Sequence, residues 1–212
     1  MTTLNVNTPE YWDRVYLHEW ESGSVQGDGY HRDYGPIHDA VVGLVPDGSA
    51  VLDIACGAGV LCRKIKRACP ASQVTGIDFS EYMVARNQEH DAALGIDYRC
   101  VDIRHSLASI ARQFDVVCMC EILEHLEEPE EVVAAAFSLL KPGGRFILTC
   151  PHDNSIPDHE HVRVWGHDDL FHLLAAYARE VTFVHFPPPY FHIWMMAYVT
   201  KHPSAPEPIV SK

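Results

Sequence analysis

Long apolar runs are missing from this sequence. It contains no stretch of about 18 consecutive apolar residues, the length that a helix needs to cross a bilayer, so we expect no membrane-spanning helix. The N-terminus lacks the basic patch and apolar run that mark a secretory signal, and we expect a cytoplasmic protein. No C-x-x-C pair occurs among the seven cysteines, which argues against a zinc cluster and favours reduced, buried thiols.

Positive charge is also scarce. The chain has 16 Lys and Arg against 29 Asp and Glu, a formal net charge of −13. A surface of this sign repels a phosphate backbone over most of its area, so we expect no nucleic-acid partner. The 212 residues, 47% of them hydrophobic, suffice for one domain with its own core, and we expect a monomer or a homodimer.

Short apolar runs alternate with segments of helical spacing through the middle of the chain. We expect strands at 50–55, 73–77, 96–101, 114–120 and 145–150, and helices at 60–68, 80–93 and 129–140. This alternation is typical of a parallel sheet with helices on both faces. A helix near 168–177 follows, and then two strands that form an antiparallel hairpin, at 180–186 and 192–200.

The two ends of the chain differ from this α/β region. Six aromatic residues fall between positions 11 and 34, whereas the last residues are rich in proline. We therefore divide the chain into an N-terminal helical segment (1–34), one α/β domain (35–201) and a disordered tail (202–212). The aromatic segment is expected either to pack on the edge of the sheet or to cover a flat ligand as a lid.

A glycine turn follows the first expected strand, in the run Asp53-Ile-Ala55-Cys-Gly57-Ala-Gly59. A ligand there would meet the N–H groups at the start of the next helix. Asp78 ends the second strand, where a carboxylate can accept hydrogen bonds from ribose hydroxyls. A dinucleotide site would have a third glycine, but Cys62 stands there, and Asp53 suits a cationic ligand better than a phosphate.

The order of these motifs resembles that of class I S-adenosylmethionine-dependent methyltransferases. The resemblance covers residues 35–200, and its motifs lie at 51–59, 76–80, 101–103, 114–126 and 139–150. It implies a Rossmann-like, seven-stranded, mostly parallel sheet of order 3-2-1-4-5-7-6, in which strand 7 is antiparallel. It also implies S-adenosyl-L-methionine as the cofactor.

The resemblance assigns ten cofactor-binding residues. Position by position, Asp78 would bind the ribose hydroxyls and Asp102 would accept from the adenine amino group, with Phe79 and Ile103 against the adenine ring. The turn would hold the methionine part. The full set is Arg32, Asp53, Ala55, Gly57, Gly59, Asp78, Phe79, Asp102, Ile103 and Cys120. Arg32 would pair with the cofactor carboxylate, and Asp53 and the backbone at Cys120 would face its amino group.

The acceptor side is marked by Glu121-Ile-Leu-Glu124-His125 after the fourth strand. On one helical turn these two carboxylates and the imidazole project together. With the later His161 they are similar to a metal-holding pattern of small-RNA 2′-O-methyltransferases, and to residues of ubiquinone-pathway O-methyltransferases. We expect instead a cluster without metal that orients the acceptor, its carboxylates screened by Arg163 or water, with His125 and His161 as candidate bases.

We therefore expect a methyltransferase that acts on a small molecule, with a hydroxyl oxygen as the acceptor. Two alternatives remain open. One is a metal-assisted RNA 3′-end 2′-O-methyltransferase, which the acidic composition opposes. The other is a non-catalytic subunit with the same fold, which would leave Asp78 and Asp102 without a purpose.

Overall fold

The computed structural model describes residues 6–24, 28–107, 110–153, 155–190 and 193–202, with the backbone alone for 28–33. These residues form two compact units, which we call the first unit (residues 1–103) and the second unit (residues 104–212). Seven strands are ordered β3-β2-β1-β4-β5-β7-β6, and β7 runs antiparallel to both of its neighbours. The predicted strand order and the antiparallel last strand are thus confirmed.

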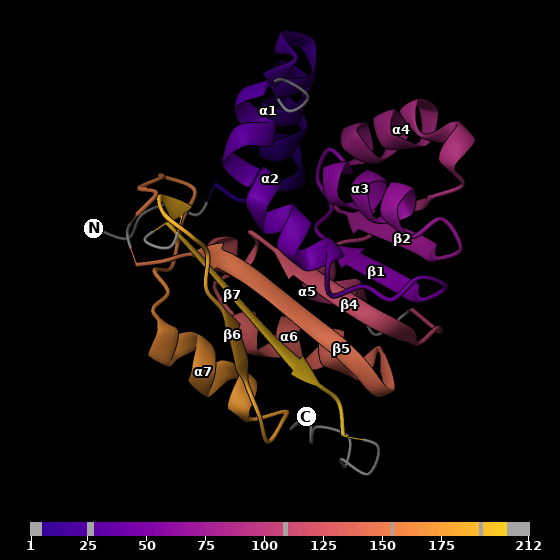
Figure 1. The fold of residues 1–212 in the computed structure, drawn as a ribbon. Helices are drawn as coiled ribbons and strands as arrows, with labels where there is room; N and C mark the ends of the chain where they lie inside the picture. Colours follow the sequence, from indigo (N-terminus) through magenta and orange to yellow (C-terminus); the bar gives the residue numbers. More distant parts are fainter. Residues whose placement is uncertain (1–5, 25–27, 108–109, 154, 191–192, 203–212) are drawn as a thin grey trace. The chain divides into compact units, whose positions relative to one another are not determined.

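The first unit contains three parallel strands and four helices (Figure 1). In chain order its elements are α1 (Pro9–Ser22), α2 (Asp28–Val42), β1 (Ala50–Ile54), α3 (Val60–Ala68), β2 (Gln73–Asp78), α4 (Glu81–His90), the 3₁₀ turn η2 (Ala92–Leu94) and β3 (Asp97–Cys100). The central strand β1 is buried along its whole length, as expected of a strand covered on both faces. Helix α1 packs against α4, and α2 packs against α3.

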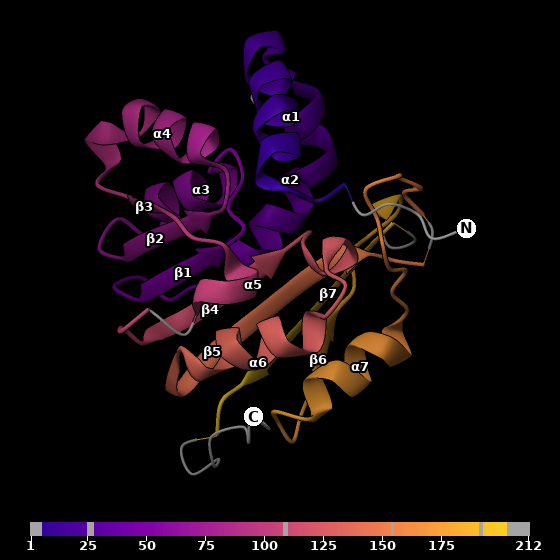
Figure 2. The same ribbon diagram turned by 180° about the vertical axis from the view of Figure 1, so that it is seen from behind.

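The second unit contains the other four strands. After α5 (Ile103–Ser106), which begins at the boundary, come β4 (Phe114–Cys120), the 3₁₀ turn η4 (Leu123–His125), α6 (Pro129–Ser138), β5 (Leu140–Pro151), α7 (His167–Ala175), β6 (Thr182–Val184) and β7 (Trp194–Thr200). Helices α6 and α7 lie on the same side of these strands (Figure 2). The second-unit core includes Val117, Met119, Phe146, Ile147 and Leu148, all completely buried.

Local sequence signals explain where the helices begin. The Ser80 hydroxyl accepts a hydrogen bond from Met83 N at 3.0 Å, which caps α4. Pro129 begins α6, where its missing N–H costs nothing, and two glutamates follow in the first turn. Thr8 caps α1 by accepting from Tyr11 N at 3.3 Å, and Gly23 ends that helix with a positive φ of 72°.

The start of β5 differs from the sequence prediction. We expected a turn at 142–144 and a strand from residue 145, yet β5 begins at Leu140. The register between β4 and β5 jumps from Phe114↔Leu140 to Val116↔Arg145, so the glycines bulge out of a continuing strand. The bulge stays attached because Gly143 N donates to Lys201 O at 2.8 Å.

Other sequence expectations have mixed outcomes. No helix among the described residues is both long and apolar enough to cross a membrane. All seven cysteines are free thiols, and five of them are buried as predicted, whereas Cys100 is exposed and Cys120 is half-buried. Of the tail predicted to be disordered, residues 203–212 lie outside the described part of the chain, so that prediction stands as it was.

Candidate active site

Three positive φ angles shape the turn after β1, which we call the glycine loop (residues 55–59). They are 59° at Ala55, 48° at Gly57 and 70° at Gly59. A Cβ atom on Gly59 would lie 2.5 Å from Tyr98 Oη, so a larger side chain does not fit there. The non-glycine Ala55 carries backbone strain, and such strain gathers at ligand-binding turns. Gly59 N donates to Cys56 O at 2.9 Å, which closes the turn.

Asp78 fastens the glycine loop to the end of β2. Its Oδ2 accepts from Gly57 N at 2.9 Å, and its Oδ1 accepts from Ser80 N at 3.0 Å. The side chain is buried, and this burial raises the pKa of Asp78 to about 6 despite those hydrogen bonds. The carboxylate also takes a hydrogen bond from the Phe79 backbone, and since its two oxygens offer about four acceptor sites, one is left for a ligand hydroxyl.

Asp53 is a second buried carboxylate in the same unit. Its Oδ2 accepts from the Cys62 thiol at 3.2 Å, and burial raises the pKa of Asp53 to about 7. Among the described residues, neither Asp53 nor Asp78 forms an ion pair with Lys, Arg or His. Among the described side chains these two desolvated acidic groups thus have no countercharge, which suits a ligand that carries a cation and hydroxyl donors.

Helix α1 lies against this loop. Asp13 accepts hydrogen bonds from the Ser80 hydroxyl and, at 3.4 Å, from Tyr82 N, both at the start of α4. A Cβ atom on Gly57 would lie 3.2 Å from Tyr16 Oη. Tyr16 and Trp20 pack on the apolar cluster of Ala58, Val60 and Met83. The aromatic N-terminal segment thus contacts the candidate cofactor loop itself.

The remaining cofactor residues predicted from the sequence lie after β2 and β3, at the end of β4 and in α2. Phe79 follows Asp78 directly, and Asp102 and Ile103 follow β3, whose Cys100 pairs with Asp78 in register. The first unit thus holds six of the ten residues at the ends of β1 and β2, together with Asp102 and Ile103 after β3. Cys120 ends β4 in the second unit. Arg32 lies in α2, where its side chain is outside the described part of the structure.

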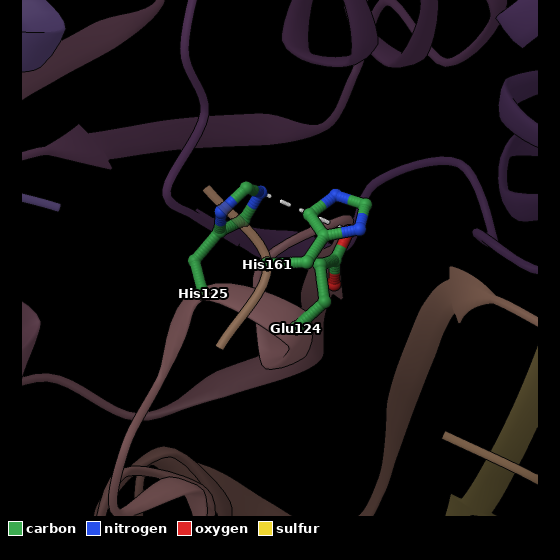
Figure 3. A group of neighbouring side chains, drawn as sticks. All are labelled: Glu124, His125 and His161. Atoms are coloured by element: carbon green, nitrogen blue, oxygen red, sulfur yellow. Dashed lines mark ion pairs between the residues drawn. The ribbon is translucent and has the colours of Figure 1, made fainter. Parts of the chain in front are cut away.

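The acceptor-side candidates converge within the second unit, in what we call the carboxylate–imidazole cluster (Glu121, Glu124, His125 and His161). Figure 3 shows Glu124, His125 and His161 pointing toward one another. One ligand atom from each of these three lies within 4.8 Å of the others. Glu124 is 3% exposed, and its Oε2 has no hydrogen-bond partner among the described residues. His125 Nε2 lies 3.9 Å from Glu124 Oε1.

Three contacts that the sequence did not reveal position this cluster. His125 Nδ1 lies 3.2 Å from Glu160 O, and a proton donated there places the lone pair of the neutral ring on Nε2. The Thr149 hydroxyl donates to Glu121 Oε1 at 2.6 Å. Glu124 O accepts from Val162 N at 2.8 Å, which docks the segment that carries His161. These partners are far apart in sequence, so no local pattern announces them.

Burial dominates the electrostatics of the cluster. It raises the pKa of Glu124 to about 8, and it raises the pKa of Glu121 with a further contribution from Glu124. It lowers the pKa of His125 to about 4, with His161 as the next cause. Arg163, which we expected to screen the carboxylates, instead pairs with Glu130 Oε1 at 3.2 Å and donates to Glu127 O. Near neutral pH the His125 imidazole is therefore neutral, and Glu124, with a pKa of about 8, is mostly protonated.

Comparison with known proteins agrees with this fold. Residues 52–148 match the family described as "Methyltransferase domain". The chain is 42% identical over 99 residues to the ubiquinone biosynthesis O-methyltransferase of Chromobacterium violaceum, covering 46% of this chain and 42% of that protein. It is 38% identical over 108 residues to that of Xanthomonas axonopodis pv. citri, covering 50% of this chain and 44% of that protein. The chain thus spans less than half the length of the curated relatives it matches.

Solved structures share the architecture at lower identity. Magnesium protoporphyrin IX methyltransferase from Synechocystis superposes with a TM-score of 0.67 at 20% identity, covering 91% of this chain and 97% of that one. The N-methyltransferase NodS from Bradyrhizobium japonicum gives a TM-score of 0.64 at 19% identity, covering 82% and 98%. These structures share the fold of the chain, and residues 52–148 match a methyltransferase domain, in agreement with the strand order that the sequence resemblance implied.

Proposed function

We propose that this protein transfers a methyl group from S-adenosylmethionine to a hydroxyl oxygen of a small molecule. The observation that carries the cofactor half is the pair of buried carboxylates, Asp53 and Asp78, beside a strained glycine loop. The relatives named as ubiquinone biosynthesis O-methyltransferases support an oxygen acceptor. The acidic composition continues to favour a small molecule over a nucleic acid.

The first-unit residues fit the parts of this cofactor. When bound, S-adenosylmethionine offers a cationic sulfonium, an ammonium group and two ribose hydroxyls. The remaining acceptor site of Asp78 accepts from a ribose hydroxyl, and Phe79 and Ile103 flank the adenine with Asp102 at its amino group. Asp53 attracts the ammonium end of the cofactor. The sequence-based assignments of the Cys120 backbone to that end and of Arg32 to the carboxylate stay predictions. A ligand with this charge gives the buried carboxylates the countercharge that the described side chains do not supply.

The carboxylate–imidazole cluster orients and deprotonates the acceptor hydroxyl. Because the methyl group leaves a neutral thioether, much of the rate comes from holding the oxygen in line with it. His125 Nε2 and His161 accept a hydrogen bond from the hydroxyl and orient its lone pair. A pKa of about 4 makes His125 a weak base on its own. Glu124, with a pKa of about 8, accepts the proton only in its ionised form, which becomes the major form above about pH 8.

A second form of the same function includes a divalent cation. The observation that favours it is the buried Glu124 Oε2, which has no partner among the described residues while His125 and His161 offer ligand atoms within 4.8 Å. Glu121, Glu124, His125 and His161 would hold a hard cation such as Mg²⁺ or Mn²⁺. Such an ion lowers the pKa of a hydroxyl that binds it and so replaces the base.

Calorimetry with S-adenosylhomocysteine and a transfer assay test the proposal together. We expect micromolar binding of S-adenosylhomocysteine and transfer of a labelled methyl group to catechol or phenol acceptors, with none to a 3′-terminal RNA nucleotide. Failure to bind would refute the enzyme assignment and favour the non-catalytic subunit. Binding with transfer to RNA alone would refute the small-molecule acceptor.

Chelation distinguishes the two forms of the acceptor site. If the cluster works without metal, activity persists in EDTA. If it holds a cation, activity disappears in EDTA and returns with Mg²⁺ or Mn²⁺. In either case cofactor affinity stays constant, because the cofactor residues of the first unit are not metal ligands.

A further inference from the structure

Helix α1 contacts both ends of α4. At the start of α4, Asp13 accepts hydrogen bonds from the Ser80 hydroxyl and from Tyr82 N. At the end of α4, the Trp20 ring meets the ring of His90 edge to face, with their centroids 5.5 Å apart. The two helices therefore lie side by side and run in the same direction.

Ser80 connects this helix contact to Asp78. The serine is completely buried, and its N–H donates to Asp78 Oδ1 at 3.0 Å. Its hydroxyl donates to Asp13 Oδ1 and accepts from Met83 N at 3.0 Å. Two carboxylates thus hold one serine from two sides, and one of them is the carboxylate that we propose to bind the ribose.

Asp13 also contributes to the N-terminal cap of α4. A helix begins with N–H groups that have no partner within the helix, and the Ser80 hydroxyl satisfies that of Met83. Asp13 Oδ1 lies 3.4 Å from Tyr82 N and places a negative charge at the positive end of the helix dipole. The start of α4 therefore depends on a carboxylate that α1 supplies.

Loss of this carboxylate would reach Asp78 through the serine. The buried Ser80 hydroxyl would have to find another acceptor, because a buried donor without a partner is costly. The first turn of α4 would shift to provide one, and the Ser80 N–H that holds Asp78 Oδ1 would move with it. Asp13 is also near enough to Asp78 for its charge to contribute to the raised pKa of that carboxyl.

Few other contacts hold α1 as firmly. None of its residues is buried, although Tyr16 and Trp20 pack on the apolar cluster beside the glycine loop. An element with little buried apolar surface detaches at low cost. Single polar contacts such as those of Asp13 therefore have a large share in keeping α1 against the loop.

We propose that Asp13 is a positioning residue of the cofactor site. It acts through Ser80 on Asp78 and keeps α1 docked beside the glycine loop, so that a bound cofactor leaves slowly. This role requires no contact between Asp13 and the cofactor. The inference rests on the proposed function, in which Asp78 binds the ribose.

Surface plasmon resonance with S-adenosylhomocysteine tests this proposal, because it measures association and dissociation rates separately. We expect Asp13→Ala to raise the dissociation rate by about tenfold or more, the effect of losing one hydrogen bond to a charged group. Asp13→Asn keeps an acceptor oxygen and should raise the rate by a smaller but measurable factor, since neutral hydrogen bonds are weaker than charge-assisted ones. Glu21→Ala is the matched control, because it removes an exposed carboxylate from the same helix, and it should leave the rate unchanged.

A double-mutant cycle shows whether Asp13 acts through Ser80. Ser80→Ala removes the hydroxyl but keeps the N–H that donates to Asp78. If Asp13 acts through that hydroxyl, adding Asp13→Ala to Ser80→Ala should raise the dissociation rate little further. Two effects that multiply in full would overturn the proposal. So would an Asp13→Ala variant that unfolds at a lower temperature but releases S-adenosylhomocysteine at the unaltered rate.

Further outcomes separate this inference from the proposed function. If Asp13→Ala fails to fold, Asp13→Asn takes its place, and an unchanged dissociation rate in that variant overturns the inference. If Asp78→Asn weakens binding while the Asp13 variants release the ligand at the unaltered rate, the inference alone is wrong. If Asp78→Asn binds as tightly as the unaltered protein, the ribose site and the inference are both wrong.

Discussion

Replacing Asp78 by Asn tests the central contact of the cofactor half. In the structure its two oxygens accept from Gly57 N at 2.9 Å and from Ser80 N at 3.0 Å. Asparagine has one acceptor oxygen, so one buried backbone N–H loses its partner, at a cost of about 1–3 kcal/mol in unfolding free energy. The sequence places Asp78 at the end of a strand, where a substitution is expected to change the free energy of unfolding little. The structure instead predicts a measurable loss.

The effect on cofactor affinity is separate and adds to this. Hydrogen bonds from ribose hydroxyls to an ionised carboxylate are worth about 1.5–3 kcal/mol each. Losing one of them weakens binding at least tenfold, because about 1.4 kcal/mol corresponds to a factor of ten. Calorimetry with S-adenosylhomocysteine measures the affinity, and thermal unfolding measures the stability. Asp97→Asn is the control, since that exposed carboxylate pairs with Arg99 at 2.6 Å on the same sheet.

One pattern of results would refute the reasoning. If Asp78→Asn unfolds at a lower temperature but binds S-adenosylhomocysteine as tightly as the unaltered protein, Asp78 merely fastens the glycine loop. The ribose would then bind elsewhere. A variant that loses affinity together with all secondary structure would be replaced by Asp78→Glu, which keeps the charge and moves it by one methylene.

Three other predictions follow from the same geometry. Cofactor affinity should fall up to tenfold per pH unit as the pH drops below about 7, because the ammonium end needs ionised Asp53, whose pKa in the free protein is about 7. Calorimetry from pH 7.5 down to 5.5 measures this, and an affinity that does not change with pH would contradict it. His125→Gln should lower turnover at least tenfold and leave S-adenosylhomocysteine affinity unchanged, whereas a parallel loss of affinity would move His125 to the cofactor side. Gly59→Ala should destabilise the fold by about 1 kcal/mol or more, because of the positive φ and the 2.5 Å approach of Tyr98, as thermal unfolding would show.

The sheet could be read from the sequence because each of its signals is local. The alternation of apolar runs with helical spacing places the strands, and the glycines at 57 and 59 mark the turn that follows β1. The bulge at 142–144 was mistaken for a turn, because glycine and proline signal both, and the contact with Lys201 that decides between them lies far along the chain.

The candidate site was harder to predict from the sequence, because the contacts that form it are not local. The residue types in the cluster were visible as Glu121-Ile-Leu-Glu124-His125, but the contacts that orient them come from distant segments. Arg163 shows how closeness in sequence can lead to a wrong prediction of contacts. It is close in sequence to His161, yet it pairs with Glu130 on α6 and leaves the buried carboxylates without its charge. Asp13 and Tyr16 could not be connected to the glycine loop by any spacing rule.

The docking of Val162 on Glu124 O offers a built-in reporter. This amide is bound at 2.8 Å by the backbone of the residue whose side chain anchors the cluster. Exchange of this amide with deuterium requires the segment that contains Val162 to detach from Glu124. A ligand that binds in the acceptor site and holds the segment in place should therefore slow the exchange. A fragment screen that follows this one amide would rank acceptor candidates by how far each slows it, before any of them has been shown to react.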